Sequence, residues 1–158
     1  MASTVSAQEL APLDTSSPKT ASAVLFKDES GNLHPLNPQQ HKLSIVHFWA
    51  TWCTPCVAEL PEVDKAAEAY GGKGVRVVAI SLDGDGHIDK VKKFLADHKI
   101  THLAPNLDFG NASFKASGLK GLPGTLFIDA TGKEIARADG PLDWKNKETV
   151  EFIEKALR

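Results

Sequence analysis

The amino-acid sequence predicts one α/β domain with a mixed central sheet and helices on its faces. Residues 42–50 and 75–82 are apolar and β-favouring, as buried central strands are. A helical pattern lies between them, and a strand-helix-strand order implies that the two strands are parallel. Residues 124–130 and 133–139 predict two more strands, and the Thr131-Gly132 turn joins them as an antiparallel pair.

The size and composition fit a globular domain and argue against two classes of function. The chain has 158 residues, enough for one domain with a real core, and 42% of them are hydrophobic. The net charge is −2 and no basic stripe is present, which argues against a nucleic-acid partner. No apolar run reaches about 18 residues, so we expect no membrane span, and the N-terminus lacks the pattern of a complete secretion signal.

The remaining segments are assigned from composition and periodicity. Residues 1–22 are rich in Ala, Ser, Thr and Pro, and we expect a flexible tail or tether before a domain over 23–158. Residues 23–36 predict a β-hairpin with its turn around Gly31. An extended piece at 103–107 and a helical turn or two at 111–117 complete the middle of the chain.

Three amphipathic helices are predicted from apolar residues that recur at steps of three and four. The first begins near the cysteines and ends at Gly71-Gly72. The apolar positions of the first helix are Val57, Leu60, Val63, Ala67 and Tyr70; of the second, Ile88, Val91, Phe94 and Leu95; of the third, Val150, Ile153 and Leu157.

The two cysteines stand in the segment FWATWCTPCVAEL, at the end of a predicted strand and the start of a helix. Pro55 suits the first helical turn, where its missing N–H costs nothing. A thiol at Cys53 faces unpaired N–H groups and the positive end of the helix dipole, which favour the thiolate. Cys56 lies one turn on and can close a disulfide with Cys53. This geometry permits exchange in which Cys53 attacks and Cys56 resolves the mixed disulfide.

Other uses of the pair have less support from the sequence. A structural disulfide across so short a loop would constrain the unfolded chain little. Zinc needs further ligands, and the candidates His98 and His102 lie over forty residues away. Binding of Cu(I) by two soft thiolates stays open as a different function. The acidic loop at 83–86 lacks the pattern of a calcium loop, and we expect a strand-to-helix loop with a helix cap there.

Three motifs resemble the thioredoxin superfamily, and most closely its TlpA-like branch of the TlpA/ResA type. They are FWATWCTPC, then Glu59 and Pro61 in CVAELP, and GLPGTLFID from residue 121. The resemblance covers residues 23–158. It implies a thioredoxin-like fold with an N-terminal β-hairpin and a TlpA-type insertion. It also implies an extracytoplasmic thiol-disulfide oxidoreductase whose only redox group is the Cys53–Cys56 disulfide, with no further cofactor.

The resemblance assigns roles to individual residues. Cys53 is the attacking thiol, Cys56 is the resolving thiol, and Trp52 shields the pair. Pro123 is the cis-proline that faces the disulfide, unless it is an ordinary loop proline. Leu122 before it offers backbone groups to an extended segment of a partner. The predicted substrate-binding residues are Trp52, Thr54, Pro55, Leu122 and Pro123.

Two further residues are predicted to be catalytic, Glu59 and His47. Glu59 matches an acidic position near the motif in TlpA-like reductases, where a carboxylate raises a thiol pKa and relays its proton. The alternative is a solvated glutamate in a first helical turn. His47 stands where thioredoxins commonly have Asp and TlpA-like proteins often Asn. It is a candidate base for Cys56 if it is neutral, or a core histidine hydrogen-bonded to backbone.

The direction of electron flow is predicted from the residues between the cysteines. Thr54 and Pro55 place no cation beside Cys53. We therefore expect a reduction potential closer to that of thioredoxin, about −270 mV, than to that of DsbA, about −120 mV. The resemblance also implies a reductase, periplasmic or otherwise extracytoplasmic, with a tail that is a mature N-terminus or the remnant of a membrane tether. Implied clients are apocytochrome c or copper-delivery proteins of cytochrome oxidase. The implied electron donor is a membrane protein resembling DsbD or CcdA, and we expect a monomer. A disulfide oxidase is the rival.

Overall fold

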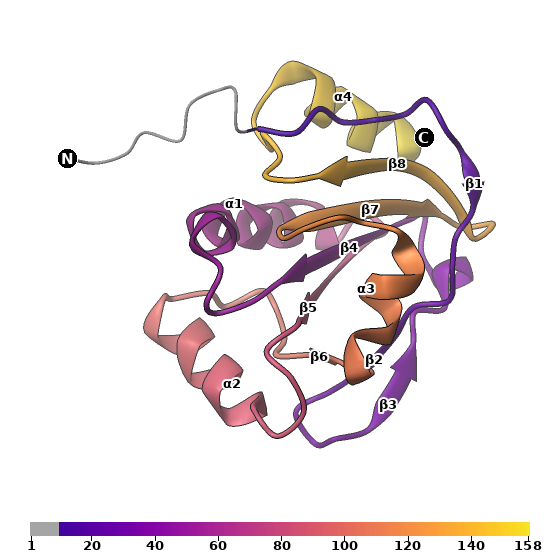
Figure 1. Cartoon of the computed structure of the whole chain (residues 1–158). Coiled ribbons are helices and arrows are strands. Elements are labelled where there is room, and N and C mark those ends of the chain that lie inside the picture. The colour runs from indigo at the N-terminus through magenta and orange to yellow at the C-terminus, as the bar shows by residue number, and fades with distance from the viewer. Residues whose placement is uncertain (1–9) are drawn as a thin grey trace.

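A computed structural model describes residues 10–158 and shows one mixed sheet with helices on both faces (Figure 1). Residues 1–9, part of the predicted tail, lie outside the described residues. The strand order is β1-β8-β7-β4-β5-β6-β2-β3. The strands are β1 (Lys19–Thr20), β2 (Leu25–Lys27), β3 (Leu33–Pro35), β4 (Leu43–Trp49), β5 (Val75–Ser81), β6 (Leu107–Asp108), β7 (Gly124–Asp129) and β8 (Lys133–Asp139).

Residues 10–158 also form four α-helices and two short 3₁₀ segments. The helices are α1 (Thr54–Gly71), α2 (Ile88–Asp97), α3 (Ala112–Ser117) and α4 (Lys147–Ala156), and the 3₁₀ segments are η2 (Pro38–Gln40) and η3 (Phe109–Asn111). Within residues 10–158 no helix has the length and apolar character needed to cross a membrane. The mixed α/β thioredoxin-like fold that the sequence predicts is confirmed; the TlpA-type insertion stays a prediction.

β4 is the central strand, and its neighbours explain the mixed sheet. It pairs in parallel with β5 and antiparallel with β7, and β7 pairs antiparallel with β8. Every residue of β4 is buried. A strand covered on both faces needs apolar side chains on both, which is why residues 42–50 form a nearly continuous apolar run rather than an alternating one.

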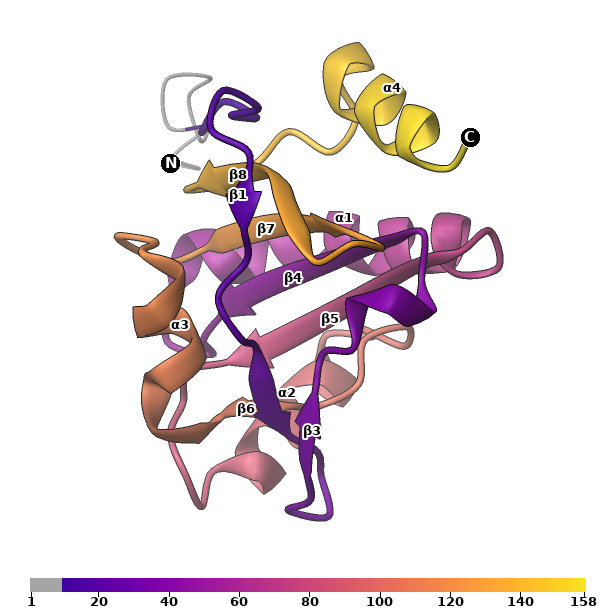
Figure 2. The ribbon, with the colours of Figure 1, turned by 90° about the vertical axis from the view of Figure 1, so that its right-hand side faces the viewer.

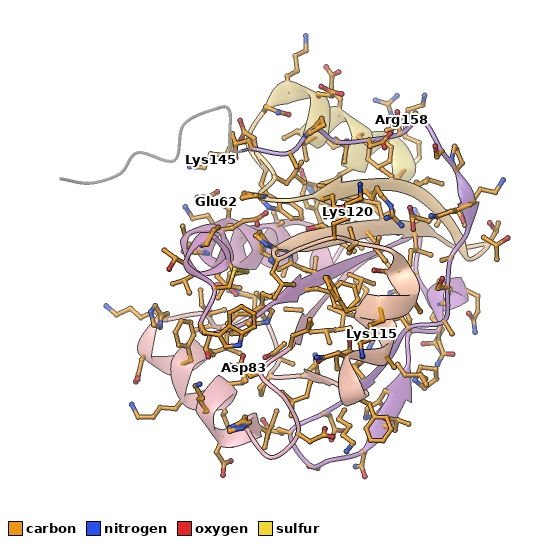
Figure 3. The ribbon with its side chains drawn as sticks, in the orientation of Figure 1. Glu62, Asp83, Lys115, Lys120, Lys145 and Arg158 are labelled. Atoms are coloured by element: carbon orange, nitrogen blue, oxygen red, sulfur yellow. A yellow bond between two sulfur atoms is a disulfide. The ribbon has the colours of Figure 1, made fainter. Side chains whose placement is uncertain are left out.

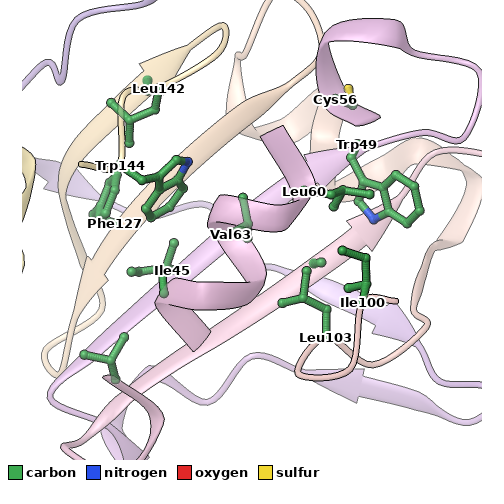
Figure 4. Packing of buried hydrophobic residues seen from close by; sticks show 14 of the residues in the cluster. Ile45, Trp49, Cys56, Leu60, Val63, Ile100, Leu103, Phe127, Leu142 and Trp144 are labelled. Atoms are coloured by element: carbon green, nitrogen blue, oxygen red, sulfur yellow. The ribbon is translucent and has the colours of Figure 1, made fainter. Parts of the chain in front are cut away.

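The two faces of the sheet have different covers. Ile45 and Trp49 of β4 point to the face where α1, α2 and α4 contribute buried residues, and Figure 4 shows Val63 and Leu60 of α1 packed there. Val46 and Phe48 point to the other face, which the hairpin and the region of α3 cover (Figure 2). Side chains alternate along a strand, so His47 lies on the α1 face, between Ile45 and Trp49.

The N-terminal part differs from its predicted boundary, while the hairpin lies where it was expected. β2 and β3 pair antiparallel as a hairpin, and Gly31 at its turn has a φ of 83°, which favours glycine. Residues 10–22 were placed in the flexible tail. In the structure, Leu13 is buried in the α1-side cluster, and β1 pairs with β8 at the edge of the sheet. The packed domain therefore includes residues before 23.

Replacing Leu13 tests whether this segment stabilises the domain. Leu13→Ala should lower the free energy of unfolding by roughly 2 kcal/mol, because it deletes a buried side chain. Leu25→Ala removes an exposed leucine of the hairpin and should change it by less than about 0.5 kcal/mol. Urea denaturation of both variants measures the difference; equal stability of Leu13→Ala and the unchanged protein would contradict the assignment.

Candidate active site

Cys53 joins the end of the central strand to the start of α1. After Trp49 the chain makes a turn that the Cys53 N–H closes on the Ala50 carbonyl at 3.2 Å. Cys53 is the N-cap of α1, and its sulfur accepts a hydrogen bond from the Cys56 N–H at 3.3 Å. Cys53 and Cys56 form a disulfide. The cap position places the sulfur of Cys53 at the positive end of the helix.

The two sulfurs differ in access. Cys53 is 7% exposed and Cys56 is 0% exposed, so a partner protein meets Cys53 first. Trp52, the residue before Cys53, is 65% exposed. A large aromatic side chain left in solvent beside a reactive disulfide offers apolar contact area to a partner.

The Leu122–Pro123 peptide bond is cis, which confirms the conformation that the resemblance implies. The next residue, Gly124, pairs with Phe48 near the end of β4. The cis bond therefore lies at the same end of the sheet as the cysteines. Leu122 packs against the buried cluster that contains both cysteines. The sheet thus brings together segments nearly 70 residues apart in the sequence; their roles in binding a substrate stay predictions.

Glu59 is buried, which differs from the solvated alternative for this residue. Its Oε2 accepts hydrogen bonds from Trp144 Nε1 at 2.6 Å and from the Leu142 N–H at 3.1 Å. Its Oε1 is buried and has no hydrogen-bond partner among residues 10–158. Burial raises the pKa of Glu59 from 4.5 to about 7, although the two donors act in the opposite direction. The carboxyl group can therefore take up or release a proton near neutral pH.

His47 is also buried, and its environment keeps it neutral. Its Nδ1 forms a hydrogen bond of 2.9 Å with Thr125 Oγ1, and its buried Nε2 has no partner in the part of the chain that the structure describes. Burial lowers the pKa of His47 from 6.5 to about 3. His47 is therefore a core histidine, as the alternative expected, but its hydrogen-bond partner is a side chain and not the backbone. At neutral pH the imidazole is uncharged and a weak base.

Trp144 connects these two groups, and sequence reasoning missed it. Its indole donates to Glu59, and its ring meets the His47 ring edge-on at a centroid distance of 6.4 Å. It lies in the loop between β8 and α4, beside Phe127 of β7 (Figure 4). Thr125 was missed as well. No local pattern marks either residue, because each partner is about eighty residues away in the sequence.

A groove beside α1 leads to Glu59. Its volume is about 320 Å³, and Pro55, Glu59 and Trp144 are among its lining residues. Glu62 and Lys145 form an ion pair of 3.2 Å at this side of α1, and Figure 3 labels both there. Glu59 therefore lies at the wall of a groove that is open to solvent.

The only soft metal ligands that the site offers are the two cysteine sulfurs after reduction. Across residues 10–158, no three His, Cys, Asp or Glu side chains gather as a group that could hold a metal ion.

Comparison with protein families gives a match that spans almost the whole chain. The Redoxin family model matches residues 9–157. Among characterised relatives, thiol-disulfide oxidoreductase ResA of Bacillus thuringiensis subsp. konkukian is 30% identical over 140 residues, which cover 89% of this chain and 76% of that protein. Thiol:disulfide interchange protein HelX of Rhodobacter capsulatus is 30% identical over 101 residues, which cover 64% of this chain and 54% of that protein.

Solved structures resemble the fold over similar lengths. A crystal structure from Chlorobium tepidum, described as thiol:disulfide interchange protein DsbE, aligns with a TM-score of 0.75 and 26% identity, covering 93% of this chain and 100% of that one. The solution structure of a thioredoxin from Neisseria meningitidis aligns with a TM-score of 0.71 and 26% identity, covering 87% of this chain and 89% of that one.

The raised pKa of Glu59 predicts a measurable dependence of stability on pH. Between pH 4.5 and about 7 the folded protein keeps a proton that the unfolded chain has lost, so the free energy of unfolding falls as pH rises. Glu59→Gln removes this fall. Denaturation at pH 4 and at pH 8 measures this. From the lower to the higher pH, the free energy of unfolding of the original protein should fall by roughly 3 kcal/mol more than that of the variant. Parallel pH curves would show that Glu59 titrates normally.

The lowered pKa of His47 predicts the opposite slope. Between about pH 3 and 6.5 the unfolded chain binds a proton that the folded protein does not, so stability is present above pH 6.5 and is lost as pH falls. His47→Asn should remove this loss. Its unfolding free energy, measured from pH 6.5 down to pH 4, should fall less steeply than that of the original protein. A titration of the His47 imidazole itself near pH 6.5, assigned by NMR of the folded protein, would contradict the lowered pKa.

Proposed function

Because the chain belongs to the Redoxin family, as a TlpA/ResA-type thiol-disulfide oxidoreductase of the thioredoxin superfamily, we propose that it reduces disulfides of extracytoplasmic client proteins. The observation that carries this proposal is the Cys53–Cys56 disulfide at the start of α1. Both cysteines are largely buried, but Cys53 keeps 7% of its surface exposed whereas Cys56 keeps none. A two-step exchange needs this asymmetry, because the buried thiol must act only within the molecule.

The reaction begins from the reduced protein. The Cys53 thiolate attacks one sulfur of a client disulfide, forms a mixed disulfide and releases the other client sulfur as a thiolate. Cys56 then attacks the Cys53 sulfur, closes the intramolecular disulfide and releases the second client thiol. Two electrons pass from the cysteine pair to the client. A dithiol donor restores the reduced protein by the same exchange in reverse.

Cys56 must lose its proton to act in the second step, and we propose that the Glu59 carboxylate is the base that accepts this proton. A base works best when its pKa is close to the ambient pH. Glu59, at about 7, meets this condition, whereas His47, at about 3, does not. The unpartnered Oε1 of Glu59 is free to take the proton, and the groove lets it pass to solvent. His47 then contributes an uncharged polar group beneath the site.

The charges around Cys53 favour the reducing direction. No cationic residue stands between the cysteines, and the Cys53 sulfur accepts a hydrogen bond from the neutral Cys56 N–H at 3.3 Å. Ionised Glu59 disfavours a neighbouring thiolate. A less stabilised thiolate makes the dithiol a better electron donor, as the contrast of thioredoxin with DsbA illustrates.

The proposed compartment is supported by the chemistry of disulfides, and the partners are part of the same proposal. Protein disulfides persist in oxidising compartments, so a reductase of structural disulfides works outside the cytoplasm, in the periplasm or its equivalent. We place the protein in such a compartment as a monomer, with or without a membrane tether. Its clients are then apocytochrome c or copper-delivery proteins, and its electron donor is a membrane protein resembling DsbD or CcdA.

A Cu(I) metallochaperone is the alternative of a different class. Reduced Cys53 and Cys56 would supply two soft thiolate ligands. Titration of the reduced protein with Cu(I) against a competing chelator separates the two functions, because a metallochaperone must hold the metal under these conditions.

Trapping tests the proposed reductase directly. Cys56→Ser removes the resolving sulfur, so the variant should accumulate a mixed disulfide between Cys53 and its client, which mass spectrometry identifies. Cys53→Ser is the matched control, and it should trap nothing and lose insulin reduction by at least about 100-fold. A Cys53→Ser variant that still reduced insulin fully would contradict the proposed function, as would a Cys56→Ser variant that traps no client in native cells.

A further inference from the structure

We propose that Asp83 is a positioning residue for the exchange reaction, because its carboxylate holds the turn that brings Cys53 to the start of α1. Asp83 lies in the loop after β5, a separate segment from the cysteine motif. The inference rests on the proposed role of Cys53 as the attacking thiol. It concerns a residue that neither touches the disulfide nor takes part in electron transfer.

Three elements meet at the Asp83 carboxylate. Oδ2 accepts the Thr51 N–H at 2.9 Å, and Oδ1 accepts the Thr51 hydroxyl. The Ser81 hydroxyl at the end of β5 donates to Oδ2 at 2.5 Å and accepts the Asp83 N–H at 3.0 Å. Lys90 of α2 lies 3.7 Å from Oδ1. The Asp83 side chain is 1% exposed, so these contacts replace water almost completely.

Thr51 is one of the two central residues of the turn before Cys53. The turn is closed by the Cys53 N–H on the Ala50 carbonyl, and β5 is fastened to β4 there by the Leu82 N–H on the Trp49 carbonyl, at 2.8 Å. Asp83 adds a second attachment, from the β5 side to the turn itself. It binds both the backbone and the side chain of Thr51, so it restrains the position and the rotation of this residue.

This role differs from the helix cap that the sequence suggested for the loop 83–86. The N-cap of α2 is His87, and it makes no side-chain cap hydrogen bond. Asp85, the other acid of this loop, is 52% exposed and pairs with Lys27 at 3.6 Å. A cap would explain neither the burial of Asp83 nor its direction toward the cysteine motif. In Figure 3, Asp83 is labelled at the end of the sheet beside α2.

The attachment matters because the central part of the turn, unlike its buried ends Ala50 and Cys53, is held little by packing. Trp52 follows Thr51 and is 65% exposed, so packing does not fix it. Cys53 must keep its sulfur at the Cys56 N–H and present it in line with a client disulfide. Small displacements of reacting atoms are costly in rate, by up to about 100-fold for 1 Å. Asp83 therefore contributes to the rate of exchange through Thr51.

The test compares variants of the full chain in insulin reduction, at a temperature where each is folded by circular dichroism. Asp83→Ala should lower the second-order rate constant about tenfold. Asp83→Asn should lower it only about threefold, because the amide oxygen still accepts the Thr51 N–H. Asp85→Ala, the matched control in the same loop, should leave it unchanged. Thr51→Val should lower the rate, and its effect should not add to that of Asp83→Ala.

A second measurement separates positioning from simple stabilisation. The rate of alkylation of reduced Cys53 by iodoacetamide, followed against pH, should change in Asp83→Asn and Thr51→Val but not in Asp85→Ala. The inference is overturned if Asp83→Ala, while folded, keeps the original rate constant and alkylation profile. If Asp83→Ala does not fold, normal behaviour of both Asp83→Asn and Thr51→Val overturns it. If Cys53→Ser keeps full activity, the proposed function fails instead, whatever the Asp83 variants show.

Discussion

The hydrogen bond from the Cys56 N–H to the Cys53 sulfur is the interaction on which the site depends. It exists because α1 begins at Cys53, directly after a turn at the end of the central strand. The N-cap position leaves Cys53 with a small exposed surface, 7%, while Cys56, one helical turn away, is fully buried. It also places the Cys53 sulfur at the positive end of the helix dipole.

Two buried titratable groups, Glu59 and His47, lie near this interaction, and burial shifts their pKa values in opposite directions. Burial raises the pKa of Glu59 and lowers that of His47, since it disfavours the charged form of each. Trp144 contacts both, so one indole ring links the proton-exchanging carboxyl group to the neutral imidazole. The site can then move a proton near pH 7 while it adds no positive charge that would favour an oxidant.

The local parts of the site could be predicted from the sequence, and the long-range parts could not. The strand, the CxxC pair and the helix follow from short patterns, whose physical cause lies within a few residues, whereas the cis-proline was implied only by the family resemblance. Glu59, in contrast, takes its pKa from burial beside Trp144, 85 residues away, and His47 takes its partner from Thr125, 78 residues away. Asp83 also reaches Thr51 only through the pairing of β4 with β5. The segment 10–22 shows the same limit, because its polar composition hides the one leucine that packs in the core.

The central claim is that this arrangement makes the cysteine pair an electron donor, and its reduction potential tests that most directly. Equilibration of the protein with mixtures of reduced and oxidised glutathione measures it. The account predicts a value near that of thioredoxin, about −270 mV, because no cation stabilises the Cys53 thiolate. A value near that of DsbA, about −120 mV, would contradict it and would make the protein an oxidase of the same fold.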